Sequence, residues 1–418
     1  MRYICDFHIH SKYSRATSSQ MVLSEIERWC KIKGIDIVGS GDLTHPGWFK
    51  ELKNNLESDG SGLYTLRGSD KKTKFILTTE ISCIYSKKGK TRRLHIIYFV
   101  PSLETAEKIN KKLDSVGNIK SDGRPILGLD VKDVAKIFWD IDPDCLVIPA
   151  HAWTPWFSIF GSFSGFDSIK ECYEELSPRI FGIETGLSSD PEMNWRWSEL
   201  DNITLISNSD AHSPSNLGRE ANVLEIDSQN LSYAGLVKIL KKNDKEKFLY
   251  TIEFFPQEGK YHYDGHSRCG VVFSPRESFK NKNLCPKCRK PLTIGVSNRV
   301  CRLADRKKID GKGRVAYRSV IPLQEIIAEV LGKQKNTKTV DNFYFDLIKK
   351  GGSEFKILLD LSAAELKKIT LPQIATAVEK MKKGEVFVQP GYDGVYGKVS
   401  VFNPKEMEKL FPKQEALL

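Results

Sequence analysis

The first 240 residues alternate between short apolar runs and longer amphipathic segments. The apolar runs are rich in β-branched and aromatic residues and have strand length. They predict strands at residues 3–8, 35–39, 75–80, 94–100, 145–149, 181–184 and 203–207. Apolar positions at helical spacing predict helices at residues 23–33, 46–56, 103–113 and 131–139. This alternation indicates an α/β architecture with a largely parallel sheet.

The pattern changes twice further along the chain. Residues 81–85 and 93–98 flank Lys87-Lys88-Gly89-Lys90 and indicate a local hairpin, whereas the strand–helix alternation fades after Leu240. Four helices are expected at residues 322–332, 340–350, 363–369 and 372–382, and strands at 386–396 and 399–402. We therefore expect an α/β domain at residues 1–250, a basic module at 251–310 and a mainly helical domain at 311–418.

Histidines and carboxylates gather where the predicted strands end. His8 and His10 close the first strand, and residues two apart on a strand project to the same side. Asp210 and His212 repeat the arrangement after the last predicted strand. Either pair alone also fits an ordinary polar strand terminus. Together they indicate a metal site that is assembled from strand ends around a barrel.

Further candidate ligands fall at matching positions, namely Asp42, His45, Glu80, His95 and His151. The carboxyl ends of parallel strands converge on one face of a barrel. His95 begins its strand and reaches that face only if the strand runs antiparallel. Singly, Glu80 fits a solvated strand end, His95 a hydrogen-bonded sheet residue and His45 a loop residue near a helix start. As a set they predict a centre for Zn²⁺, Mn²⁺ or Fe²⁺ rather than Mg²⁺ or Ca²⁺.

A second constellation has the spacing of a structural zinc site. His266-x-x-Cys269 is followed by Cys285-Pro286-Lys287-Cys288, which together make a four-ligand set. His262 competes with His266 for the fourth position, and unrelated thiols in a basic loop are the alternative. Four protein ligands leave no open coordination position, so we expect this zinc to hold together a segment too small to build its own core.

Basic residues surround that segment. The chain carries 64 Lys and Arg against 53 Asp and Glu, a formal net charge of +11. The cluster comprises Lys280, Lys282, Lys287, Arg289, Lys290, Arg299, Arg302, Arg306, Lys307, Lys308, Lys312, Arg314 and Arg318. It predicts contact with a phosphate backbone, and a solvated lysine-rich surface is the alternative. No row of base-reading residues is evident on a helix here.

The loop after His151 is rich in aromatic residues. Trp153, Trp156, Phe157, Phe160, Phe163 and Phe166 alternate there with Ser and Gly. Such rings either stack on an unpaired base or plug the mouth of the barrel. Trp153 and Phe157 are the side chains expected to face the pocket.

Composition places the chain among globular proteins. It has 418 residues, 40% hydrophobic and 28% charged, which suggests two or three domains. A signal peptide and a membrane-spanning run are not expected. The nine cysteines are scattered and odd in number, which favours a reduced, cytoplasmic protein without membrane association. We expect it to be a monomer.

The ordered set of His-x-His, Asp and His, Glu, His, His and Asp-x-His resembles the polymerase-and-histidinol-phosphatase (PHP) superfamily of metal phosphoesterases. Longer stretches resemble endonuclease Q, a DNA-repair nuclease family that incises beside deaminated bases. They are residues 6–11, 39–46, 186–191, 207–214, 260–266, the zinc segment and 390–397. The resemblance covers nearly the whole chain. It implies a distorted (β/α)7 barrel of the PHP type.

The resemblance also implies a ligand set. His8, His10, Glu80 and Asp210 would hold a first ion, and Glu80 would bridge to a second ion held with His95 and His151. His212 and Asp42 would form a weaker third site. Many superfamily members place another His or Asp where this chain has Ser14-Arg15-Ala16-Thr17, so two firmly held ions are expected. Whether His45 binds metal or only orients Asp42 is open.

A metal-activated hydroxide would attack a phosphodiester in line. Asp210 or Asp42, with Glu80 as the bridging ligand, would assist, and Arg15 or Arg196 would hold a phosphate oxygen. By resemblance, the DNA strand would be cut 5′ to uracil, hypoxanthine, xanthine or an abasic site. A small-molecule phosphoesterase and a non-catalytic DNA-binding protein are the alternatives. Residues 414–418 loosely resemble peptides that dock on bacterial sliding clamps, although a frayed tail also fits.

Overall fold

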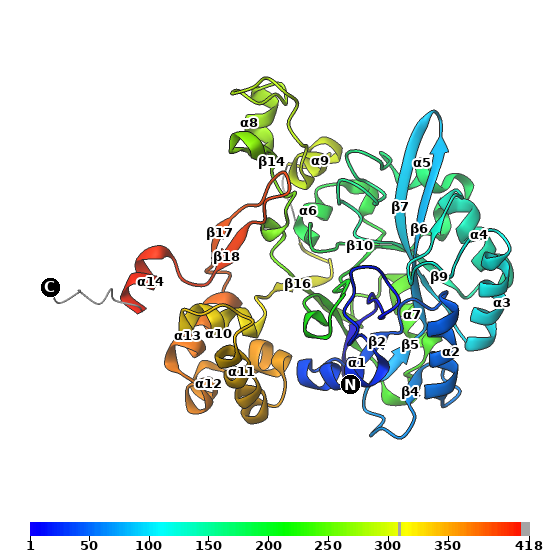
Figure 1. Cartoon of the computed structure of the whole chain (residues 1–418), viewed down its shortest axis with the longest axis horizontal. Coiled ribbons are helices and arrows are strands. Elements are labelled where there is room, and N and C mark those ends of the chain that lie inside the picture. The colour runs from blue at the N-terminus through cyan, green and yellow to red at the C-terminus, as the bar shows by residue number, and fades with distance from the viewer. Residues whose placement is uncertain (308–310, 411–418) are drawn as a thin grey trace.

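The computed structural model describes residues 1–307 and 311–410. Lys308 of the basic cluster and the clamp-like residues 414–418 lie outside the described residues. The chain forms a mixed α/β part, a small segment around the cysteines and a group of C-terminal helices (Figure 1).

The largest sheet has eight strands in the order β16-β13-β12-β1-β2-β5-β4-β3. These strands are β1 (Arg2–Asp6), β2 (Ile37–Gly39), β3 (Leu56–Ser58), β4 (Tyr64–Leu66), β5 (Lys74–Ile76), β12 (Ala221–Glu225), β13 (Phe248–Glu253) and β16 (Ala316–Ser319). β1 pairs in parallel with β2 but antiparallel with β12, and β12 is antiparallel to β13. The expectation of a largely parallel sheet is therefore wrong, because β12 is antiparallel to β1 and β13 is antiparallel to β12, which extends the sheet beyond residue 240.

A second sheet has the order β8-β6-β7-β9, and β10 and β11 form a parallel pair. The strands are β6 (Thr78–Lys87), β7 (Lys90–Phe99), β8 (Ile126–Leu127), β9 (Leu146–Pro149), β10 (Gly182–Glu184) and β11 (Thr204–Ile206). β6 and β7 form the predicted hairpin, which projects beyond its neighbours in Figure 1. The strand expected at residues 75–80 proves to be the end of β5 and the start of β6, separated by Leu77.

The predicted helices of the α/β part are confirmed within a few residues. They are α1 (Leu23–Lys33), α2 (Pro46–Asn55), α3 (Leu103–Asp114) and α4 (Val131–Ile141), followed by the shorter α5 (Ile169–Tyr173), α6 (Pro191–Trp195) and α7 (Tyr233–Lys242). α3 begins where the Ser102 side chain accepts a hydrogen bond from the Thr105 amide. Inside the sheets, Phe7 and Phe99 are fully buried and in edge-to-face contact.

The segment around the cysteines contains β14 (Asp264–His266), β15 (Val271–Phe273), α8 (Pro275–Lys280) and α9 (Val296–Leu303). The chain then returns to the large sheet, because β16 pairs in parallel with β13. The remaining elements are α10 (Leu323–Leu331), α11 (Lys338–Gly351), α12 (Ala363–Ile369), α13 (Pro372–Lys382), β17 (Phe387–Gln389), β18 (Lys398–Ser400) and α14 (Pro404–Leu410). The four predicted helices are thus confirmed as α10 to α13. No described helix is long and apolar enough to cross a membrane.

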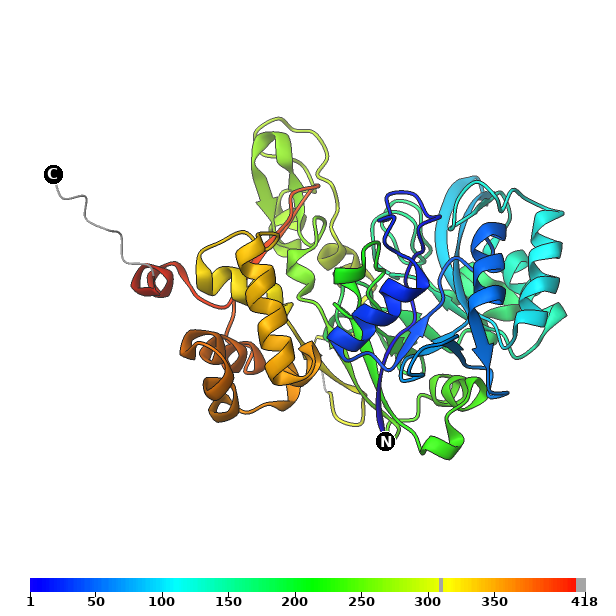
Figure 2. The same cartoon turned by 60° about the horizontal axis from the view of Figure 1, so that its bottom comes forward.

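Figure 2 shows the C-terminal helices beside the α/β part, on the side of α1. A buried ion pair joins the two, because the Lys33 ammonium at the end of α1 lies 2.6 Å from a Glu354 carboxylate oxygen. Glu354 also accepts hydrogen bonds from the Tyr344 hydroxyl (2.6 Å) and the Leu323 amide (3.0 Å). One carboxylate therefore joins α1 to α10 and α11, which follow about 300 residues later in the sequence.

The Glu354→Gln substitution should lower the free energy of unfolding by about 3 kcal/mol, because it leaves the Lys33 charge buried without a counter-ion. Chemical denaturation followed by circular dichroism measures this. The exposed pair of Lys350 and Asp346 provides the control, since Asp346→Asn should cost less than about 1 kcal/mol. Equal effects of the two substitutions would contradict the structural role of Glu354.

Candidate metal centre

The two histidine motifs predicted from strand ends lie side by side. Ile9 and Ala211 form a parallel bridge, and the His10 amide donates to the Ala211 carbonyl at 3.0 Å. The backbone at Asp210 has a φ of 46°, a left-handed conformation that non-glycine residues seldom adopt. This local geometry brings the Asp210 carboxylate to the imidazoles of His8 and His10.

His8, His10, Glu80 and Asp210 form the first group, with one possible ligand atom from each lying within 4.8 Å of all the others. The His10 Nε2 atom is 3.1 Å from Asp210 Oδ1 and 3.3 Å from Glu80 Oε2. His8 Nε2 is 3.5 Å from the same Glu80 oxygen. The Nε2 atoms of both histidines and Asp210 Oδ1 are buried without a hydrogen-bond partner in the described chain. Converging, unpartnered nitrogen and oxygen donors fit a divalent transition metal.

Glu80, His95 and His151 form the second group. Glu80 Oε1 lies 2.9 Å from His95 Nδ1 and 3.3 Å from His151 Nε2. The two oxygens of one carboxylate therefore face different groups, as a bridging ligand requires. β7 runs antiparallel to both β6 and β9, which is the condition under which His95 was expected to reach this centre.

Two buried carboxylates, Asp42 and Glu184, contact the Nδ1 atoms of His10 and His8, on the side of each ring away from Nε2. Asp42 Oδ1 lies 2.9 Å from His10 Nδ1, while its Oδ2 accepts from the Ser11 amide (2.6 Å) and the Ser11 and Ser14 hydroxyls. Burial raises the pKa of Asp42, but the His10 ring and these donors lower it below its usual value overall. Because both Asp42 oxygens are engaged, its side chain orients His10 rather than pointing at either group.

Glu184 plays the same part for His8, and sequence reasoning missed it. Its oxygens lie 3.0 and 3.2 Å from His8 Nδ1, and they accept from the His151 amide (2.7 Å) and the Asn208 side chain (2.9 Å). A carboxylate that accepts a hydrogen bond from Nδ1–H keeps the ring proton on Nδ1, so Nε2 has a free lone pair that can bind a metal ion. The available signal was an acidic residue at the end of the predicted strand 181–184.

His45 and His212 lie outside both groups. The His45 ring stacks on Tyr13 at a centroid distance of 4.3 Å, and its Nε2 is 3.2 Å from the Lys120 carbonyl oxygen. The His212 ring lies 4.4 Å from that of His10, with its Nδ1 directed at the Asp210 carbonyl oxygen (2.9 Å). His212 therefore borders the first group, whereas His45 is occupied by a loop and an aromatic ring.

The arginine at the centre is not one of those expected. Arg124 Nη1 lies 3.0 Å from Glu80 Oε2, on a half-buried side chain. The Arg15 side chain instead is exposed and pairs with Asp122, and Arg196 Nη1 lies 3.3 Å from the Cys301 sulfur. An arginine in a loop carries no positional signal, so no pattern in the sequence favoured Arg124.

The cysteine segment assembles as the spacing predicts. His266, Cys269, Cys285 and Cys288 bring their ligand atoms within 4.8 Å of one another, whereas His262 lies outside this group. Burial raises the pKa of the Cys285 thiol, but hydrogen bonds from the Cys288 and Lys287 amides lower it overall. Amides that point at a sulfur favour its thiolate form, which is the form that binds Zn²⁺.

Comparison with solved structures identifies the fold. PfuEndoQ, a lesion-specific endonuclease from Pyrococcus furiosus, is 32% identical with a TM-score of 0.85, and the match covers 98% of this chain and 97% of that chain. A structure of endonuclease Q in complex with a 27-mer duplex carrying an abasic lesion at the active site matches equally well, over 100% of both chains. The chain belongs to the endonuclease Q family.

Two curated proteins also match this endonuclease Q family member. Uncharacterized protein MJ0043 of Methanocaldococcus jannaschii is 36% identical over 260 residues, which make up 62% of this chain and 32% of that protein. The chain thus spans about a third of the length of that relative. Uncharacterized protein YqxK of Bacillus subtilis is 28% identical over 377 residues, 88% of this chain and 89% of that protein. Residues 322–385 match the family model of the MJ0043 C-terminal domain.

The aromatic loop of this family member is divided between core and surface. Trp153 is only 1% exposed and donates to the Asn194 side chain at 2.7 Å, so its ring is not available for stacking on a base. The half-buried Phe157 contacts the His95 ring at a centroid distance of 4.7 Å. Arg299 donates to the Phe160 and Phe166 carbonyls at 2.8 and 2.9 Å, so its guanidinium holds this loop. Arg289 is exposed, as a phosphate contact requires.

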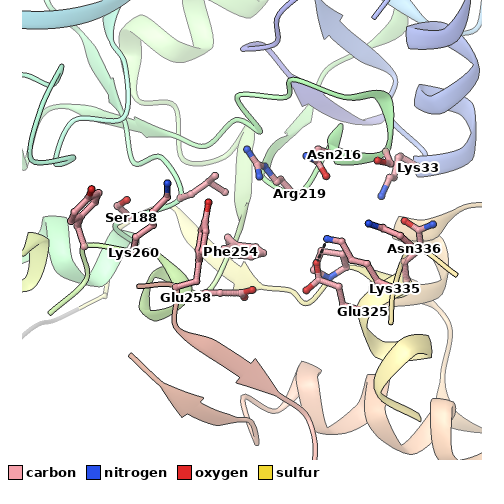
Figure 3. Close-up of a pocket in the computed structure, with 17 residues that line it drawn as sticks. Lys33, Ser188, Asn216, Arg219, Phe254, Glu258, Lys260, Glu325, Lys335 and Asn336 are labelled. Carbon is pink, nitrogen blue, oxygen red and sulfur yellow. Dashed lines mark hydrogen bonds and ion pairs between the residues drawn. The ribbon is translucent and has the colours of Figure 1, made fainter. Parts of the chain in front are cut away.

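A cavity of about 430 Å³ lies where the α/β part meets the C-terminal helices. Figure 3 shows Asn216 and Arg219 on one side of it and Glu325 and Lys335 on the other. Arg219 donates through Nε to the Ser209 carbonyl (2.8 Å), directly beside Asp210. Burial raises the pKa of Glu258 in this cavity to about 7. The cavity is therefore polar, carries charges of both signs and adjoins the loop that presents Asp210.

Two buried glutamates face each other at the end of the β12–β13 ladder. Ala221 pairs with Ile252 in the antiparallel ladder, so the next residues outward, Glu220 and Glu253, are opposite neighbours. Burial raises the pKa of Glu253 to about 8 and that of Glu220 well above its usual value. Glu253 accepts from the Thr185 hydroxyl at 3.2 Å, next to Glu184. The folded protein therefore holds protons at this pair near neutral pH.

The contribution of Glu253 to stability should fall between pH 4.5 and 8. In this range the unfolded chain releases the Glu253 proton while the folded chain keeps it, so raising the pH favours unfolding by on the order of 1 kcal/mol per pH unit. Denaturant titrations at several pH values measure the slope. The Glu253→Gln variant should show a flatter dependence. Parallel curves for wild type and variant would contradict the assignment.

Proposed function

We propose that the protein is a DNA-repair endonuclease that hydrolyses the phosphodiester 5′ to a deaminated base or an abasic site. The observation that carries this proposal is the Glu80 carboxylate, whose two oxygens face two separate groups of histidines. Such a shared carboxylate suits a pair of metal ions acting on one phosphate. The related endonuclease Q structure with an abasic duplex supports DNA as the substrate. Uracil, hypoxanthine and xanthine are the proposed damaged bases.

In this proposal, His8, His10, Glu80 and Asp210 hold one ion, and Glu80, His95 and His151 hold the other. When bound, paired divalent ions supply an activated hydroxide and offset the charge of the phosphate. Glu184 and Asp42 fix the tautomers of His8 and His10. The Asp210 carboxylate is more exposed than that of Glu80, and it assists proton transfer during hydrolysis. Arg124, whose guanidinium lies beside Glu80 Oε2, donates to a phosphate oxygen.

We further propose that residues 1–250 form a distorted barrel of the PHP type, with β16 as an added strand. Residues 251–310 form a module built on one structural zinc, held by His266, Cys269, Cys285 and Cys288. Residues 311–418 form the mainly helical domain. The net charge of +11 and exposed cations such as Arg289 support binding to the DNA backbone, which weakens as salt rises. A monomeric cytoplasmic protein and contact with a sliding clamp remain predictions.

The Asp210→Asn variant should lose nicking by at least about 1000-fold while keeping its affinity for the lesion, because it removes a metal-facing oxygen without altering the DNA-binding surface. Labelled duplexes with uracil, hypoxanthine, xanthine, an abasic site or no lesion, each with Mn²⁺ or Mg²⁺, provide the assay. Asp227→Asn, at an exposed position, is the matched control.

The outcomes separate the alternatives. If the wild-type protein hydrolyses a simple phosphomonoester but does not bind DNA, the protein is a small-molecule phosphoesterase instead. Binding of lesion duplexes by the wild type without nicking, with either metal ion, would indicate a non-catalytic DNA-binding protein.

The Cys285→Ser variant should contain one zinc fewer per chain and bind DNA more weakly, because the module loses a ligand and the segment lacks a large core of its own. Elemental analysis of purified protein gives the metal content. Cys145→Ser changes a buried cysteine outside the metal groups and should leave the metal content unchanged. Unaltered zinc in Cys285→Ser would refute the proposed ligand set.

A further inference from the structure

The loop after His151 exposes one aromatic ring among several buried ones. Phe160, Phe163 and Phe166 are three residues apart, and their exposed fractions are 0%, 52% and 1%. Phe163 stacks on Trp156 with a ring-centroid distance of 4.6 Å and an interplanar angle of 3°. The two rings are therefore parallel, as nucleobases are in a stack, and Phe163 remains accessible to solvent.

The neighbouring contacts keep this pair of rings in place. Trp156 meets Tyr261 edge to face at 5.3 Å, and the Ser162 hydroxyl donates to the Ile294 carbonyl at 3.3 Å. Arg299 binds the carbonyls of Phe160 and Phe166 on either side of Phe163. Tyr261, Ile294 and Arg299 all belong to the segment around the cysteines, so the aromatic pair is held against that segment. A rigid aromatic surface loses little entropy when a flat ligand stacks on it.

The surroundings favour a nucleobase over an apolar protein partner. The exposed Arg93 is two residues from His95 on the same face of β7, and its guanidinium lies 5.9 Å from the centre of the Phe157 ring. Among the described residues, no carboxylate pairs with Arg93. The Ser164 hydroxyl donates to the Arg93 carbonyl at 3.2 Å, so this cation lies beside the loop that carries the open ring of Phe163. An unpaired cation and an open ring so placed match a phosphate and a base of the same nucleotide strand.

We propose that Phe163 and Trp156 form a stacking platform for the base that lies opposite the lesion. This proposal rests on the proposed endonuclease function. An abasic lesion carries no base of its own, so the base across from it is the one freed from pairing. Its π-face can stack on Phe163 whatever its identity, which suits a protein that must accept any partner of the damaged nucleotide.

The test places 2-aminopurine opposite an abasic analogue in a duplex bound by the Asp210→Asn protein, which prevents nicking. Stacking quenches 2-aminopurine, so binding should reduce its emission. With Phe163→Ala added, the emission should stay several-fold higher and the affinity should drop about tenfold, within the range of base–aromatic stacking. Phe163→Trp should restore both values. Phe279→Ala, which removes another exposed phenylalanine, should match the parent.

Each result is decisive for one of the two proposals. If the wild-type protein nicks lesion duplexes but Phe163→Ala changes neither emission nor affinity, the platform is refuted and the endonuclease function stands. Quenching that occurs only when 2-aminopurine flanks the lesion would also refute the platform as stated. If the wild type neither binds nor nicks any lesion duplex, the proposed function itself fails.

Discussion

The structure depends on how it balances the buried charge of Glu80. This carboxylate is almost fully buried, and burying an unpaired carboxylate costs several kcal/mol. His8, His10, His95, His151 and Arg124 all approach its two oxygens. The backbone conformations that deliver these side chains are strained in places, since His151 and Asp210 both have positive φ values. The residues around Glu80 are thus arranged for the centre at the expense of local backbone preference.

Much of this centre could be predicted from the sequence because its ligands follow strands. His8, His10, Glu80, His151 and Asp210 each lie in or directly after a short apolar run, and strand ends that meet at one edge bring such residues together. The direction in which neighbouring strands pair was harder to predict from the sequence. β12 and β13 carry ordinary strand sequences, but nothing in them shows that β12 runs antiparallel to both β1 and β13. The expectation of a largely parallel sheet failed for that reason.

Residues that orient a ligand or a loop, without binding metal or DNA themselves, were the hardest to predict from the sequence. Glu184 and Asp42 look alike in the sequence, as acids near strand ends, yet each is defined by the histidine that it holds. Arg299 was expected to contact DNA because it lies in a basic run, but its donors are used by carbonyls of the aromatic loop. Charge along the sequence indicates a polyanionic partner for the chain as a whole. It does not indicate which Lys or Arg side chains are available to bind that partner.

The bridge between Ile9 and Ala211 ties together residues about two hundred positions apart. Closing so long a loop carries a large entropic cost, which only the completed sheets can offset. We therefore expect the first group of ligands to assemble late in folding, after most of the α/β part is in place. A nascent chain on the ribosome exposes His8 and His10 long before Asp210 has been synthesised, so a complete ligand cage cannot exist until the α/β part has emerged.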